Sequence, residues 1–134
     1  MFPLTSKKIQ SLAIFLIAVL ISGILSQATT ASVVEVEIGQ LLGFIEHSGC
    51  AVYRNGSWYS ASEARAHLEK KYRYFRDKGL MNTTEDFIAR VATASSVSGE
   101  PYQVKCDELE PISSADWLTK ELQRLQKSSA ATRP

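Results

Sequence analysis

One histidine and a run of serines are the residues of this sequence that could carry out a hydrolysis. His67 could act as a general base, with a serine of the Ser95–Ser98 segment as the nucleophile. Glu63 lies one helical turn before His67 and could orient its ring. However, the sequence lacks the Gly-x-Ser-x-Gly motif in which many hydrolases carry their nucleophile. We therefore favour structural roles, with the serines shaping the turn after a helix and His67 packing beside a buried stripe.

A second set of residues is suited to recognition. It combines planar polar groups at a predicted hairpin turn with cationic and aromatic side chains on one flank of the helix that follows. The candidate binding residues are Arg54, Asn55, Trp58, His67, Lys71 and Tyr74. If Arg54 and Lys71 are exposed, as we expect, the set forms a cationic, partly aromatic patch suited to an acidic group. The competing interpretation is that the aromatic residues build the core and that Asn55 serves only the turn.

The chain has two cysteines, Cys50 and Cys106. In an exported protein such a pair predicts a disulfide. A zinc site would need more ligands at closer spacing, and only His47 and His67 are available to add. We therefore predict a disulfide, no metal and no cofactor.

The N-terminus has the order of features found in secretory signal peptides. Lys7 and Lys8 precede an apolar run (residues 12–25) that is short for a membrane span, and a Ser-Gln-Ala sequence ending at Ala28 follows. We predict a signal peptide over residues 1–28, with cleavage after Ala31 as the second choice and an uncleaved anchor as the alternative. Cleavage after Ala28 removes two lysines and changes the net charge from +1 to −1. A nearly neutral chain argues against nucleic acid or a membrane surface as a partner.

The local patterns indicate which elements position these residues. Apolar spacing predicts a helix over residues 34–47, and Asn55-Gly56 predicts a hairpin between strands at 50–54 and 57–59. The sequence Ser60-Ala-Ser-Glu63 is a capping box that predicts a helix to about residue 78.

The second half of the chain predicts three further elements. These are a helix that begins at residues 83–84, a strand over residues 102–106, and a helix that begins near residue 113. The fold class is therefore α+β, with a small three-stranded antiparallel sheet, the hairpin plus one strand, packed against about four helices. We predict one domain over residues 32–126 and a disordered tail over residues 127–134.

Several of these segments resemble the YfeK-like family of small exported bacterial proteins, a domain of unknown function. The resemblance covers about residues 41–125, and its distinctive pieces are Cys50, Arg54-Asn55-Gly56, His67-Leu68, Lys71-Tyr72 and Ser95-Ser96. It implies a periplasmic setting in Gram-negative bacteria and supplies no catalytic residues. We therefore predict a periplasmic, non-catalytic binding or accessory protein whose partner is an envelope protein or a glycan. The alternatives are a hydrolase that uses His67 and a glycan- or peptidoglycan-binding module.

Overall fold

The computed structural model of the protein describes residues 30–31 and 33–132. The predicted signal peptide and its cleavage site at Ala28 lie outside the described residues. Val34–Pro134 form one compact unit, in which residues 34–47 are helical. Among the described residues, no helix is both long and apolar enough to cross a membrane.

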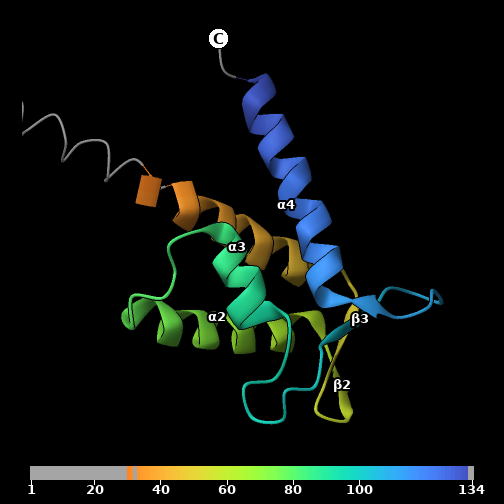
Figure 1. The fold of residues 1–134 in the computed structure, drawn as a ribbon. Coiled ribbons are helices and arrows are strands. Elements are labelled where there is room, and N and C mark those ends of the chain that lie inside the picture. The colour runs from red at the N-terminus through yellow and green to blue at the C-terminus, as the bar shows by residue number, and fades with distance from the viewer. Residues whose placement is uncertain (1–29, 32, 133–134) are drawn as a thin grey trace, which may run out of the picture. The chain divides into compact units, whose positions relative to one another are not determined.

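A four-stranded antiparallel sheet forms one side of this unit (Figure 1). Its strands are β1 (Ala51–Arg54), β2 (Ser57–Tyr59), β3 (Gln103–Lys105) and β4 (Ile112–Ser113), in the order β2-β1-β3-β4. The α+β class and the first three strands are as predicted. The prediction of three strands is wrong by one, because it missed β4. This strand has only two residues, which pair with β3.

The register of the sheet separates its two faces. Val52 pairs with Tyr59 and with Val104, while Tyr53 pairs with Trp58. Because side chains alternate along a strand, Val52 and Val104 are buried beneath the helices, and Trp58 lies on the opposite, exposed face.

Helix α2 (Ala61–Asp77) begins at the predicted capping box. The Ser60 hydroxyl accepts the backbone N–H of Glu63, and the Glu63 carboxylate accepts the backbone N–H of Ser60. The buried stripe of the helix consists of Ala64, Leu68 and Tyr72. Gly79, which has a positive φ, lies just past the end of the helix.

The next helical segment consists of α3 (Thr84–Phe87) and η1 (Ile88–Ala92), a π-helical turn. A second capping box, at Thr83, starts it. The hydroxyl of Thr93 then bonds to the carbonyl of Ile88, five residues earlier, at the wide turn. After that turn the chain leaves the helix and forms the loop that leads to β3.

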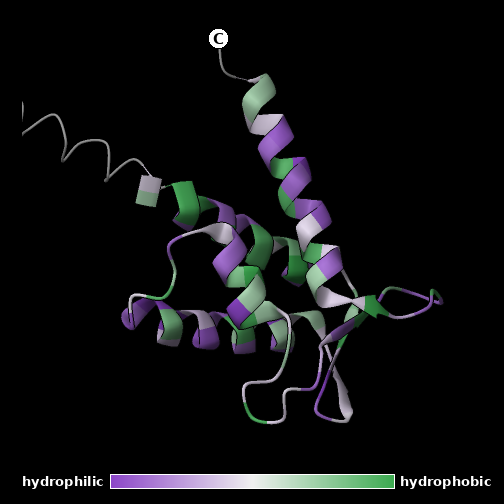
Figure 2. Ribbon diagram, in the orientation of Figure 1, coloured by the Kyte–Doolittle hydropathy of each residue, from purple (hydrophilic) through white to green (hydrophobic). Residues whose placement is uncertain are grey.

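Helix α4 (Ser114–Ala131) follows β4 directly, with Ser113 as its cap. Leu118 and Leu122 are buried in the hydrophobic core, whereas the part of α4 that projects from it carries many hydrophilic residues and ends in a pale green turn (Figure 2). The structure differs from the predicted tail, because residues 127–131 are helical. The hydroxyls of Ser128 and Ser129 donate to carbonyls four residues earlier in these last turns.

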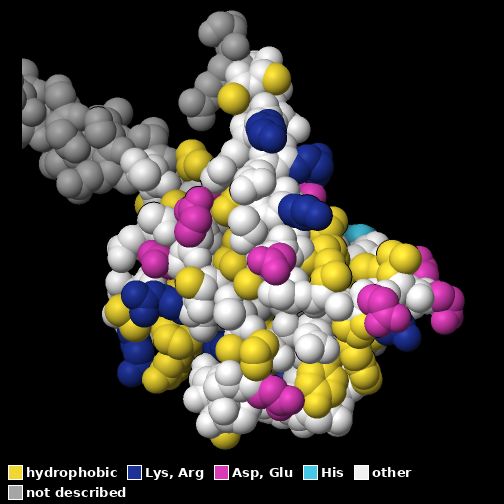
Figure 3. All heavy atoms as spheres, turned by 45° about the vertical axis from the view of Figure 1, so that its right-hand side comes forward, with side chains coloured by type: hydrophobic (Ala, Val, Ile, Leu, Met, Phe, Trp, Pro, Cys, Tyr) yellow, Lys and Arg dark blue, Asp and Glu magenta, His cyan; other side chains and the backbone are white. Residues whose placement is uncertain are grey.

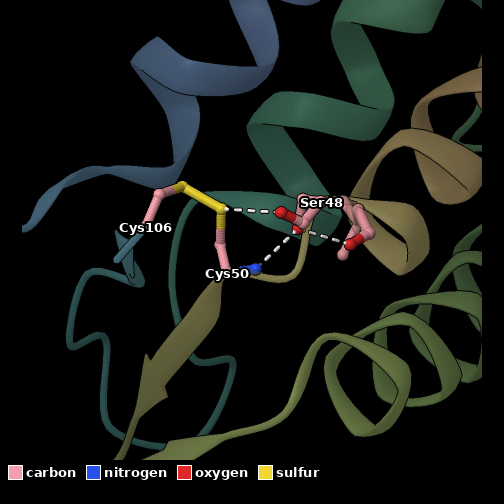
Figure 4. The surroundings of a disulfide bond; sticks show 4 residues. Ser48, Cys50 and Cys106 are labelled. Carbon is pink, nitrogen blue, oxygen red and sulfur yellow. Dashed lines mark hydrogen bonds between the residues drawn. A yellow bond between two sulfur atoms is a disulfide. The ribbon is translucent and has the colours of Figure 1, made fainter. Parts of the chain in front are cut away.

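The predicted disulfide between Cys50 and Cys106 is present, and its two ends have a sequence separation of 56 (Figure 4). It lies beside the pair formed by Ala51 and Lys105, so it joins the start of β1 to the end of β3. Ser48 shapes the approach to Cys50, because its hydroxyl accepts the Cys50 N–H at 3.1 Å and donates to the Ile45 carbonyl at 2.7 Å. The disulfide therefore joins β1 to β3, and Ser48 links this junction to the end of the N-terminal helix.

Candidate functional site

A cleft of about 550 Å³ lies where the hairpin tip, one flank of α2 and the loop before β3 come together. The hairpin contributes Arg54 and Asn55, and the loop contributes residues 95–97. The members from α2 lie on one flank of that helix: His67, Lys70, Lys71, Tyr74 and Phe75. Tyr102, which precedes β3, is also part of the lining.

The turn at the hairpin tip determines which way Arg54 points. Asn55 and Gly56 both have positive φ, 47° and 85°, as a two-residue turn of this type requires. Arg54 therefore pairs with Ser57 and lies on the face of the sheet that carries Val52. That face is the one covered by α2, so the guanidinium is directed at the flank of this helix.

Arg54, His67 and Tyr102 form a chain of polar contacts at one wall of the cleft. Nη1 of Arg54 lies 2.9 Å from Nδ1 of His67 and 3.4 Å from Nε2, and Nε2 lies 3.3 Å from the Tyr102 hydroxyl. An arginine only donates hydrogen bonds and keeps its positive charge, so its position beside the ring favours the neutral form of His67. The guanidinium also lies over the Tyr59 ring, 4.6 Å from its centroid.

The electrostatics of the cleft favour this neutral imidazole. Burial lowers the pKa of His67, and the positive charges of Arg54, Lys71 and Lys70 lower it further. Burial also lowers the pKa of Lys71, whose ammonium donates to the Ala94 carbonyl at 2.6 Å and lies over the Tyr102 ring. Arg54 and Lys71 were expected to be exposed, but both are half-buried and held by specific contacts.

The charges of the cleft are not balanced by acids within it. Its lining contains Arg54, Lys70 and Lys71 but no aspartate or glutamate. Of the six arginines within residues 33–132, five lie within ion-pair distance of a carboxylate, and Arg54 is the exception. Acidic side chains gather elsewhere, for example on the projecting loop between β3 and β4 (Figure 3).

Three comparisons with known proteins bear on this chain. The model of a family of unknown function, DUF5329, matches residues 32–126. The chain belongs to this family. It is also 42% identical, over 49 residues, to the uncharacterised protein YfeK of Salmonella typhimurium strain LT2. That match covers 37% of this chain and 39% of the relative, and no solved structure matches. The resemblance inferred from the sequence is thus confirmed, and neither the description of the family nor the name of the relative assigns an activity.

Two of the serines that the hydrolase hypothesis would use, Ser95 and Ser98, have structural partners. The Ser95 hydroxyl is buried and accepts the backbone N–H groups of Val97 and Ser98. The Ser98 hydroxyl donates to the side-chain carbonyl of Asn55 at 2.7 Å, which ties the loop to the hairpin tip. The ring of His67 contacts Arg54 and Tyr102 instead. These contacts favour the interpretation in which the serines shape the loop.

Five of the six predicted binding residues line the cleft together: Arg54, Asn55, His67, Lys71 and Tyr74. Trp58 does not, because the two-residue turn places it beside Tyr53 on the other face of the sheet, with ring centroids 5.3 Å apart. The register that an Asn-Gly turn imposes could have revealed this from the sequence alone. Lys70 and Tyr102 were missed. Lys70 is adjacent to Lys71, whereas no local pattern indicates that Tyr102 reaches the cleft.

Among the described residues, no three His, Cys, Asp or Glu side chains gather in a way that could hold a metal ion.

Proposed function

We propose that this protein is a non-catalytic binding module of the periplasm, and that its cleft holds an acidic group of an envelope glycan or protein. The observation that carries the proposal is the unbalanced charge of the cleft. Arg54, Lys70 and Lys71 line one space that contains no carboxylate, although the other described arginines all have one nearby. A ligand carboxylate or phosphate would supply the missing partner.

The contacts of Arg54 prepare it for such a ligand. Its guanidinium is fixed by the His67 ring on one side and by the Tyr59 ring beneath it. Little side-chain freedom is then left to lose on binding, which favours affinity. Tyr74 is 57% exposed and offers an aromatic face next to the cations. This combination suits an acidic sugar or a peptide better than a bare inorganic ion.

The periplasmic location is supported by two features. The signal-peptide pattern at the N-terminus predicts export, and the Cys50–Cys106 disulfide is typical of oxidising compartments.

The charge of the cleft can be tested with small anions. We would titrate the natively purified protein with sodium acetate and with inorganic phosphate, and follow backbone amide NMR shifts. We expect shifts that centre on residues 54–56, 67–74 and 94–97. Arg54→Gln and Lys71→Met should each weaken anion binding about 10-fold or more, because a charged hydrogen bond contributes roughly 1.5–3 kcal/mol.

Lys120→Met is the matched control, because Lys120 is exposed on α4 and does not line the cleft. It should leave the titration unchanged. An equal effect of Lys120→Met and Arg54→Gln, or shifts spread evenly over the surface, would contradict the proposal. Affinity capture from envelope extract with the wild type, Arg54→Gln and Lys120→Met would then identify the partner as the species lost only with Arg54→Gln.

A further inference from the structure

A small recess adjoins the cleft, between the hairpin and α2. It shares three lining residues with the cleft: Arg54, His67 and Tyr102. Its volume is about 20 Å³, which is room for one group the size of a water molecule or a methyl. Both spaces therefore border the guanidinium that we expect to hold the acidic group.

The inner wall of the recess is apolar. Val52, Ala64 and Leu68 form it, and all three are buried. Ala64 and Leu68 are one helical turn apart on the buried stripe of α2, and the single methyl of Ala64 leaves space that a larger side chain would fill. Glu63 is the one acid that lines the recess, and it is engaged at the N-cap of α2, where it accepts the Ser60 N–H at 2.9 Å and the Ser60 hydroxyl at 2.7 Å.

This arrangement favours a particular shape of ligand in addition to a negative charge. An apolar, methyl-sized space beside the cation suits an acid whose neighbouring carbon carries one small alkyl group. A phosphate or sulfate has no carbon in that position. An acid with a branched or long side chain would exceed the space, and glycine would leave the space without an apolar contact.

We propose that the group recognised in the cleft is a carboxylate whose α-carbon bears a methyl, as in a peptide that ends in alanine. The carboxylate contacts Arg54 and Lys71, the methyl enters the recess between Val52 and Ala64, and the preceding peptide lies along the cleft beside Tyr74. This inference rests on the proposed function, since it requires that the cleft bind an acid.

A series of short peptides tests it. The probes are N-acetyl dipeptides that end in glycine, alanine or valine, the last two in both enantiomers, each as the free acid and as the amide. Their affinities for the natively purified protein would be measured by NMR titration. We expect the better alanine enantiomer to bind about 10-fold more tightly than glycine, because one methyl in an apolar pocket contributes at least about that factor. Valine should bind no better than glycine.

Two variants locate the selectivity. Ala64→Val fills the recess and should abolish the preference for alanine over glycine while the glycine-terminated acid still binds. Ala66→Val is its matched control, since Ala66 is exposed on the same helix and does not line the recess. Circular dichroism melting would confirm that both variants fold. If Ala64→Val does not fold, the peptide series on the wild type alone tests the selectivity for alanine.

The outcomes separate this inference from the proposed function. If free acids bind but glycine, alanine and valine are equal, the recess plays no part and the inference is wrong, while the anion site stands. If amides bind as well as acids, both are wrong. If no peptide binds, the inference is wrong, and the acetate and phosphate titrations still decide whether the cleft binds anions.

Discussion

Removal of the disulfide is the perturbation whose effect follows most directly from the structure. Cys50 and Cys106 are 56 residues apart in sequence, and the loop they close contains the hairpin, α2, α3, η1 and β3. The chain-entropy model gives about 4 kcal/mol of stabilisation for a loop of this length. A unit of this size has an unfolding entropy of about 0.2 kcal/mol/K, so we expect the Tm to fall by about 20 °C.

The measurement is urea denaturation of the oxidised wild type, the wild type reduced with dithiothreitol, and the Cys50→Ala/Cys106→Ala double variant. Reduction leaves both sulfur atoms in place, so the first difference isolates the covalent link. The double variant also removes the buried Cys50 sulfur and should lose slightly more stability. A loss below about 1 kcal/mol on reduction would refute the reasoning. It would mean that the unfolded chain already holds these two segments together.

Three further predictions concern His67, the N-cap of α2 and the signal peptide. The pKa of His67 is lower in the folded protein, so the unfolded chain takes up a proton there at a higher pH, and stability should fall as the pH drops from about 7 to about 5. In urea denaturation across this range His67→Gln should flatten the dependence, and an unchanged dependence would contradict this role of His67. Ser60→Ala removes the N-cap of α2 and should cost about 1 kcal/mol by the same method, and a cost near zero would contradict the capping role. Intact-mass measurement of the exported protein should show that it lacks residues 1–28, and retention of these residues would contradict cleavage at Ala28.

Local sequence signals predicted the parts of the fold that depend on neighbouring residues. Both capping boxes, at Ser60 and Thr83, start helices as expected, and Asn55-Gly56 forms its turn. These features need only a few adjacent residues, so they can be read without knowledge of the rest of the chain. Strand β4 could not be predicted in this way, because its two residues become a strand only through pairing with β3.

The residues of the candidate site likewise differ in whether local sequence could predict them. The hairpin tip and the flank of α2 were predicted to meet because only Ser60 separates β2 from α2. Tyr102 and the loop at residues 95–97 come from a part of the chain some 30 residues further on, and only the tertiary fold brings them to His67. The half-burial of Lys71 has the same cause, since the Ala94 carbonyl that holds it belongs to that distant loop.

The stretch from Cys50 to His67 shows why architecture and binding need not be alternative explanations for the same residues. The disulfide fixes the start of β1, the Asn55-Gly56 turn fixes its register with β2, and the N-cap fixes the start of α2. A slip of one residue in β1 would exchange its two faces and direct Tyr53, rather than Arg54, at α2. The disulfide, the turn and the N-cap therefore determine which side chain enters the cleft. All three lie within one short segment, and together they place the Arg54 guanidinium against the His67 ring.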